Sequence, residues 1–140
     1  MRSRPPRQIV RRMPRVLIAE DNPEIRTLVG RVLQGEGYAV ETADDGSEAI
    51  AKIGQEHYDA ILLDFMMPAV SGFDVVEWIE RNRPDVAKSC VIIITAAVHE
   101  LRNFDTSKVY AAIAKPFDVV ELRDVVRKCV AEKNKNTAKA

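Results

Sequence analysis

The sequence lacks the marks of membrane-spanning, secreted and disulfide-linked proteins. No apolar run approaches the roughly 20 residues that cross a bilayer, and the N-terminus has no apolar stretch of the secretory type. The 140 residues include only two cysteines, Cys90 and Cys129, which form no C-x-x-C motif and have no nearby histidine cluster. A disulfide and a zinc site are therefore disfavoured. Length and composition predict one domain with its own core, working in the cytoplasm.

Acidic residues are absent from the first fifteen positions, which hold six arginines, although the net charge of the whole chain is zero. The other 125 residues carry 15 basic and 21 acidic side chains. A basic block of this kind is typical of a disordered or interacting tail. We expect a disordered arm over residues 1–14, a folded domain over 15–131 and a C-terminal tail over 132–140.

The charge distribution also bears on partners. The acidic body makes nucleic acid an unexpected partner for the domain. The arginine arm leaves open a contact with nucleic acid or an anionic membrane. The alternative, which we favour, is a vestigial leader before Met13.

Short apolar runs alternate with segments of helical periodicity throughout the body. We expect five strands, each followed by a helix, over 16–19, 38–43, 60–63, 91–94 and 111–114. The four consecutive β-branched residues of the fourth run are typical of a central strand that is covered on both faces. The helix expected within 98–109 should be short or distorted. This alternation predicts an α/β fold with a doubly wound parallel sheet.

Polar side chains stand at the ends of four of these strands. They are Glu20 and Asp21 after the first, Asp64 after the third, Thr95 after the fourth and Lys115 after the fifth. The carboxyl ends of parallel strands meet at one edge of the sheet, where open α/β sheets bind their ligands. Hard divalent cations prefer carboxylate oxygens, and a lysine ammonium can neutralise phosphate charge. The sequence therefore predicts a pocket for a divalent cation and a phosphoryl group.

Four motifs occur in order along the chain: the acidic pair, the D-x-M-M-P-x-x-S-G run that begins at Asp64, the threonine after the fourth strand and the K-P-F run after the fifth. From about Pro14 to about Ala131, the chain thereby resembles the receiver domain of two-component response regulators. The resemblance implies a flavodoxin-like sheet of the single-domain, CheY-like type, with five helices and the strand order 2-1-3-4-5. It also implies that Asp64 accepts a phosphoryl group from a sensor histidine kinase or a phosphotransfer protein.

The resemblance assigns further roles around this aspartate. A site for Mg²⁺, with Mn²⁺ as an alternative, would use the carboxylates of Asp21 and Asp64 and the backbone carbonyl of Met66. Glu20 would contribute through a bound water. Thr95 and Lys115 would bind the phosphoryl oxygens, and the peptide bond before Pro116 would be cis. The protein would be a signalling phosphoacceptor that assists its own phosphorylation and dephosphorylation, and not an enzyme. Its output would be a changed surface that binds a downstream protein.

Several positions depart from the family pattern. The family carries an aromatic residue three positions before the lysine, whereas this chain has Ala112. Tyr110 lies on the same side of the expected strand but one repeat farther from the site, so the family's threonine–aromatic switch lacks its usual aromatic. The residues two positions after the phosphoacceptor and two after the threonine are Met66 and Ala97, which cannot orient an attacking water by hydrogen bonding. We therefore expect slow self-dephosphorylation.

Other interpretations of single residues stay open. Glu20 and Asp21 could cap the first helix, because acidic residues are favoured at helix N-termini. His57 and His99 have no matching base or ligand partner, so we expect both to face solvent.

The sequence fits two other classes of phosphate-binding protein less well. A phosphatase of the haloacid dehalogenase type also uses an aspartate after a parallel strand, but it needs a second aspartate where this chain has Met66. No Gly-rich phosphate loop follows the first strand, which argues against a dinucleotide-binding module. A stand-alone receiver is favoured because few residues follow the last helix. A receiver fragment of a larger regulator or hybrid kinase is the alternative.

Overall fold

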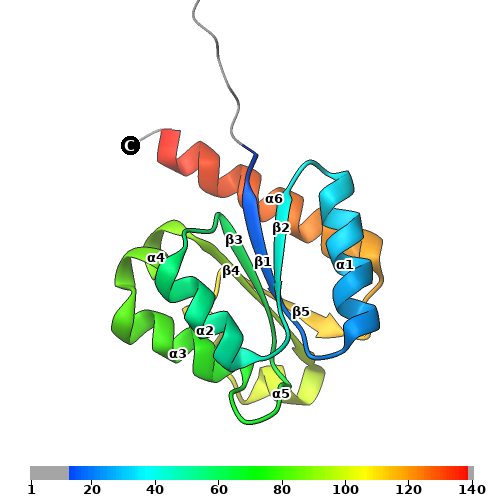
Figure 1. Ribbon diagram of the computed structural model, residues 1–140, viewed down its shortest axis with the longest axis vertical. Coiled ribbons are helices and arrows are strands. Elements are labelled where there is room, and N and C mark those ends of the chain that lie inside the picture. Colours follow the sequence, from blue (N-terminus) through cyan, green and yellow to red (C-terminus); the bar gives the residue numbers. More distant parts are fainter. Residues whose placement is uncertain (1–12, 139–140) are drawn as a thin grey trace, which may run out of the picture.

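The computed structural model describes residues 13–138 and shows a five-stranded sheet between two layers of helices (Figure 1). The strands are β1 (Arg15–Ala19), β2 (Ala39–Ala43), β3 (Ala60–Asp64), β4 (Val91–Ala97) and β5 (Ala111–Lys115). The α-helices are α1 (Pro23–Gly35), α2 (Gly46–Gln55), α3 (Gly72–Asn82), α4 (Pro84–Ser89), α5 (Val98–Arg102) and α6 (Val119–Ala138), and a 3₁₀ turn, η1, covers Thr106–Lys108. The predicted disordered arm lies outside the described residues, apart from its last two positions.

The sheet has the predicted topology. All four strand pairs are parallel, and the strands lie in the order β2-β1-β3-β4-β5. Every residue of β3 is buried, as are the first six residues of β4. β4 lies between β3 and β5, which confirms that the β-branched run forms an inner strand covered on both faces.

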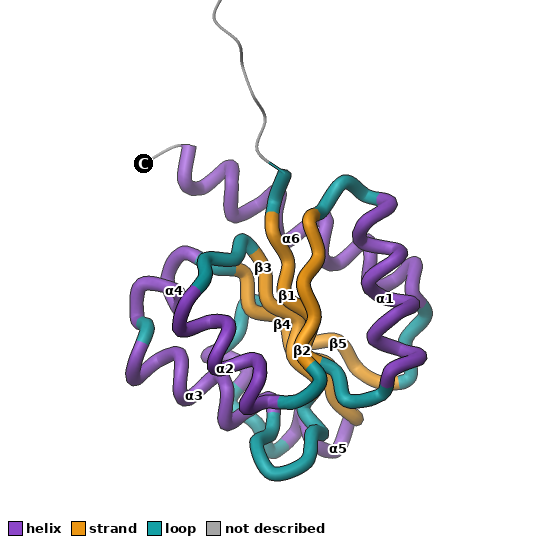
Figure 2. The backbone as a smooth tube through the Cα atoms, viewed as in Figure 1, coloured by secondary structure: helices purple, strands orange, loops and turns teal. Residues whose placement is uncertain are grey.

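Helices cover both faces of the sheet (Figures 1 and 2), and each face carries its own hydrophobic core. α1 and α6 cover one face, with Leu33 and Leu122 in its core. α2, α3 and α4 cover the other face, with Ile53 and Ile79 in its core. The doubly wound arrangement predicted from the alternation of strands and helices is therefore confirmed.

Two predictions about single residues agree with the structure. Cys90 and Cys129 are free thiols that belong to different cores, on opposite faces of the sheet. His57 and His99 are both exposed. Within residues 13–138, none of the helices has the length and apolar character that crossing a membrane requires.

The described residues form six α-helices, where five were predicted. The additional helix, α4, begins directly after Arg83 at the end of α3. In the sequence, Pro84 ends the apolar helical pattern of α3. It also suits the first position of a new helix, because its φ is already helical and its missing N–H would have no partner there. The helix predicted within 98–109 is short, as expected, since α5 has five residues and is followed by one 3₁₀ turn.

α6 is longer than its apolar pattern indicates. Among its residues up to Lys135, the last buried apolar one is Val130, but the helix continues to Ala138. Most of the segment predicted as a C-terminal tail, 132–140, is therefore helical instead. The additional turns contain glutamate, lysine and alanine, which favour a helix without packing, and neither glycine nor proline interrupts them.

Candidate functional site

Parallel pairing brings the predicted polar residues to one edge of the sheet. Asp64 is the last residue of β3 and pairs with Thr95 of β4. Lys115 is the last residue of β5 and pairs with Ala97, two positions beyond the threonine. Glu20 directly follows β1. The predicted site residues therefore lie side by side at the carboxyl ends of four adjacent strands.

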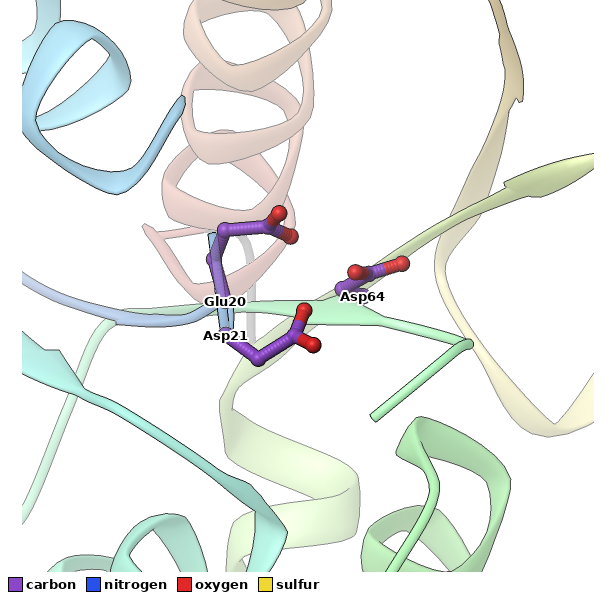
Figure 3. Close-up of side chains that lie close together, drawn as sticks. All are labelled: Glu20, Asp21 and Asp64. Carbon is purple, nitrogen blue, oxygen red and sulfur yellow. The ribbon is translucent and has the colours of Figure 1, made fainter. Parts of the chain in front are cut away.

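Three carboxylates converge at this edge (Figure 3). Glu20 and Asp21 extend from the end of β1 and Asp64 from the end of β3, and one oxygen of each lies within 4.8 Å of the others. Glu20 is 6% exposed and Asp64 4%, whereas Asp21 is open to solvent. Acids this close repel one another, and a bound divalent cation relieves that repulsion. The donor set consists of hard oxygen ligands and fits Mg²⁺.

Lys115 places a positive charge next to Asp64. Its Nζ lies 2.7 Å from Asp64 Oδ1, which also accepts a hydrogen bond from the backbone N–H of Met66 at 3.2 Å. The lysine side chain is 32% exposed, so its ammonium reaches the buried carboxylate from the solvent side. The peptide bond between Lys115 and Pro116 is cis, as the resemblance implied.

The acidic cluster retains a proton when no cation is bound. Burial raises the pKa of Glu20 to about 8, and the Asp64 carboxylate beside it adds to the rise. Asp21 acts in the same direction and Lys115 opposes it. A cation that binds here has to displace this proton, so metal binding and protonation of Glu20 compete.

In a chelator, the free energy of unfolding is expected to fall as pH rises from about 5 to about 8. Folded Glu20 keeps its proton until about pH 8, whereas an ordinary glutamate loses it near 4.5, so the folded state binds more protons in this window and is destabilised through it. For this one group we expect a decrease of about 3 kcal/mol. Urea unfolding at several pH values measures it. Glu20→Gln should flatten the profile, and the same slope in that variant would contradict the assignment.

The loop that follows Asp64 is tied to both β4 and α3. The N–H of Phe65 donates to the carbonyl of Thr95 at 2.8 Å, and the N–H of Gly72 donates to the carbonyl of Phe65 at 3.1 Å. A Cβ at Gly72 would lie 2.5 Å from the carbonyl oxygen of Asp64. The missing side chain therefore lets α3 begin directly against the end of β3, which holds the backbone of Asp64 in place.

Arg26 contacts the turn that carries Glu20 and Asp21, a role that its sequence pattern did not predict. Its Nη1 donates to the carbonyl oxygen of Glu20 at 2.8 Å, and its Nε lies 3.5 Å from Asp44 Oδ1. The available signal was its position, because a cation near the N-terminal end of a helix is disfavoured by the helix dipole. Such a residue therefore needs a partner, and this one has two.

Phe104 was also missed by the sequence analysis. It lies between α5 and η1, is 8% exposed, and packs edge-on against Phe65 and Phe73, with ring centroids 6.1 Å and 5.0 Å away. Phe65 directly follows Asp64. The segment after β4 is thus packed against the residue next to the central aspartate.

No aromatic ring stands at the place on β5 where the family carries one. Ala112 is exposed on β5. The N–H of Tyr110 donates to the carbonyl of Ile92 near the start of β4, and its hydroxyl donates to Glu132 on α6 at 3.1 Å. Tyr110 therefore lies at the amino end of the strand, away from Thr95, and does not take the place of the family's aromatic.

Residues 16–127 match the family described as the response regulator receiver domain. The chain belongs to this family. The receiver domain is 32% identical over 117 residues to sporulation initiation phosphotransferase F of Bacillus subtilis, a match that covers 81% of this chain and 91% of that protein. This relative, the family match and the solved structures below identify the domain as a phosphoacceptor of two-component signalling.

Solved structures of response regulators have the same fold. The receiver domain is 33% identical to the response regulator protein TrrA of Thermotoga maritima, solved in complex with Mg²⁺-BeF, with a TM-score of 0.74 over 84% of this chain and 99% of that one. It is 30% identical to the chemotaxis response regulator CheY4 of Vibrio cholerae, with a TM-score of 0.76 and the same coverage.

Several relatives are considerably longer than the matched segment. The receiver domain is 38% identical over 118 residues to the DNA-binding dual master transcriptional regulator RpaA of Synechocystis, which covers 82% of this chain and 48% of that protein. It is 41% identical over 69 residues to the transcriptional regulatory protein TcrA of Mycobacterium tuberculosis, which covers 49% of this chain and 27% of that protein. The chain thus spans half or less of the length of these two curated relatives.

Proposed function

We propose that Asp64 is the phosphoacceptor of this receiver domain and that Lys115 and Thr95 bind the transferred phosphoryl group. The observation that carries the proposal is the position of the Asp64 carboxylate, which is 4% exposed, belongs to the acidic cluster and lies 2.7 Å from the Lys115 ammonium. Phosphoryl transfer needs in-line positioning and neutralisation of charge more than covalent help from the protein. Both needs are supported by this arrangement.

The proposed reaction is a transfer between two protein side chains. A carboxylate oxygen of Asp64 attacks the phosphorus of a phosphohistidine on a sensor histidine kinase or a phosphotransfer protein. The P–N bond breaks, and the imidazole leaves with the bonding electrons and takes a proton from solvent. The product is an acyl phosphate, which water later hydrolyses to restore the aspartate. The domain thereby assists its own phosphorylation and dephosphorylation and does not turn over a separate substrate.

The groups that read the phosphoryl group come from neighbouring strands. An acyl phosphate brings up to two negative charges close to Asp64 at neutral pH, and the Lys115 ammonium can pair with its oxygens. The Thr95 hydroxyl comes from the residue paired with Asp64 and would donate a hydrogen bond to another of these oxygens. These new contacts stabilise the conformation of the phosphorylated domain over that of the unphosphorylated one. The surface that a downstream protein binds changes with that conformation.

The residues that would hold Mg²⁺, or Mn²⁺ in its place, are the three clustered acids and one backbone carbonyl, those of Glu20, Asp21, Asp64 and Met66. A cation bound there would supply positive charge against the phosphoryl oxygens. Burial of two of the three acids and the raised pKa of Glu20 support this assignment, because both indicate a demand for positive charge. The exposed carboxylate of Asp21 leaves the cation a route from solvent.

A partner surface adjoins the site. A hollow of about 450 Å³ is lined by apolar residues of α1 and of the β5–α6 loop, among them Ile25, Leu28 and Phe117, and by Lys115, whose ammonium contacts Asp64. Ile25 and Leu28 are 37% and 50% exposed. A phosphohistidine-bearing protein that docks here would present its imidazole next to Asp64.

The direct test is incubation of the purified chain with acetyl phosphate and Mg²⁺, followed by intact mass. One phosphoryl group should be added, and peptide mapping after borohydride reduction should locate it on Asp64. A chelator should prevent the reaction, because no cation then offsets the negative charge of the phosphoryl group that approaches the acidic cluster. An unmodified chain in Mg²⁺ would contradict the proposal. Continuous turnover of a phosphomonoester would indicate a phosphatase instead.

The phosphorylated state is expected to last well beyond seconds in Mg²⁺. Met66 is 63% exposed beside the site, and its thioether cannot orient an attacking water. Decay of the phosphorylated mass over time measures the lifetime. Met66→Asn supplies a group that hydrogen-bonds water and should shorten the lifetime several-fold, whereas Met66→Leu should leave it unchanged. A lifetime of seconds in the native chain would contradict this expectation.

The output is proposed to be contact with a downstream protein in the cytoplasm. A stand-alone receiver is supported by phosphotransferase F, of which the match covers 91%. The alternative of a receiver within a larger regulator or hybrid kinase is supported by relatives such as RpaA, of which the match covers 48%.

A further inference from the structure

Arg26 links the two turns that border the acidic cluster. One of these turns follows β1 and carries Glu20, whose carbonyl oxygen accepts a hydrogen bond from Arg26 Nη1 at 2.8 Å. The other follows β2 and carries Asp44, whose Oδ1 lies 3.5 Å from Arg26 Nε. The arginine side chain is only 19% exposed, so it is held between the two turns. One guanidinium thus contacts both turns from a third element, α1.

The chemistry of the two contacts requires an arginine. One contact ends on a carbonyl and the other on a carboxylate, and they use different nitrogens of the same planar group. A guanidinium presents several donors in a fixed fork, whereas a lysine ammonium is a single charged point on a flexible stem. A lysine at this position keeps the charge but not the fork.

We propose that Arg26 is a positioning residue of the metal site, which holds the turn that bears Glu20 and Asp21 in the geometry that binds a divalent cation. This inference rests on the proposed function. The two acids stand next to each other on one turn, and repulsion between the carboxylates of Asp21 and Asp64 tends to open it. The contact of Arg26 with the carbonyl of Glu20 opposes that opening. Such outer contacts to metal ligands commonly change metal affinity by about 10–100-fold when they are removed.

The direction in which the Mg²⁺ affinity changes when Arg26 is replaced distinguishes a positioning role from a purely electrostatic one. If Arg26 acted only through its positive charge, then its removal would relieve repulsion of the incoming cation and tighten Mg²⁺ binding. If it acts by holding the turn, then its removal weakens Mg²⁺ binding in spite of that relief. The two explanations therefore predict opposite changes in the dissociation constant.

The test uses the full chain with Mg²⁺ alone as the probe. The rise in the free energy of unfolding with Mg²⁺ concentration gives the dissociation constant for each variant. We expect Arg26→Gln and Arg26→Lys each to weaken Mg²⁺ binding by about tenfold or more. The control is Arg31→Gln, which removes the same charge from an exposed position on α1 and should leave the affinity unchanged or slightly tighter.

A double-mutant cycle with Asp44→Asn tests the link itself. Asp44→Asn should weaken Mg²⁺ binding in the native chain and have much less effect when Arg26 is already glutamine. An equal loss in both backgrounds would assign the effect of Asp44 to charge and overturn the link. Native affinity in both Arg26 variants, or a change only in metal-free stability, would also overturn the inference. If Mg²⁺ fails to stabilise even the native chain, then the proposed metal site itself fails.

Discussion

Asp64→Asn is expected to abolish phosphorylation by acetyl phosphate in the presence of Mg²⁺. The neutral amide has no carboxylate oxygen to attack phosphorus, and it removes one of the three charges that attract the cation. The fold should be retained, because the amide is nearly isosteric and its oxygen can still accept a hydrogen bond from Lys115 Nζ. The free energy of unfolding in chelator should fall by no more than about 2 kcal/mol, the loss expected when one hydrogen bond between charged groups is weakened. Intact mass and urea unfolding of the same preparation measure both results.

The matched control for this variant is Asp124→Asn. Asp124 is 54% exposed on α6, where it pairs with Arg123, and it lies outside the acidic cluster. Its phosphorylation should equal that of the native chain. A phosphoryl group on Asp64→Asn would show that another residue accepts phosphate, and peptide mapping would then identify it.

Gly72→Ala is expected to lower the free energy of unfolding by about 3 kcal/mol. The added Cβ would lie 2.5 Å from the carbonyl oxygen of Asp64 and 3.1 Å from the Cα of Phe65, both of which are backbone atoms that cannot rotate away. α3 and the end of β3 would therefore have to separate. Because Asp64 is the last residue of β3, Mg²⁺-dependent phosphorylation should slow as well.

Gly35→Ala is the matched control for this substitution. Gly35 is the last residue of α1, and a Cβ there would meet nothing within 4 Å. Alanine should stabilise the helix by up to about 1 kcal/mol. Urea unfolding of the two variants compares the same chemical change in a closed and an open position. Equal stabilities would contradict the steric argument for Gly72.

The fold could be predicted because the strands carry their own signals. Four β-branched residues from Val91 to Ile94 predicted an inner strand, and β4 lies between β3 and β5. The helix boundaries were less certain. Pro84 ends one helix and begins the next, and apolar periodicity cannot separate these roles. The last turns of α6 lie beyond its apolar stripe, so only helix propensity could have predicted them.

The charged groups of the site were predictable for a similar reason. Asp64 and Lys115 end apolar strands, and parallel strands bring such ends together. The residues that hold these groups in place were not predictable, because they act through contacts between elements that are distant in the sequence. Arg26 meets Asp44 only after α1 packs beside the end of β2, and Gly72 meets Asp64 only after α3 returns to the sheet.

The three-ring contact of Phe104 bears on local stability. Between β4 and β5 the chain has one five-residue helix and one 3₁₀ turn, so few backbone hydrogen bonds hold this segment. Its attachment depends largely on the burial of Phe104 against Phe65 and Phe73, with Leu101 and Val109 packed alongside. Detachment of the segment therefore costs far less free energy than unfolding of the sheet. Since Phe65 directly follows Asp64 in the chain, a displacement of that aspartate would move one of the two rings against which Phe104 packs.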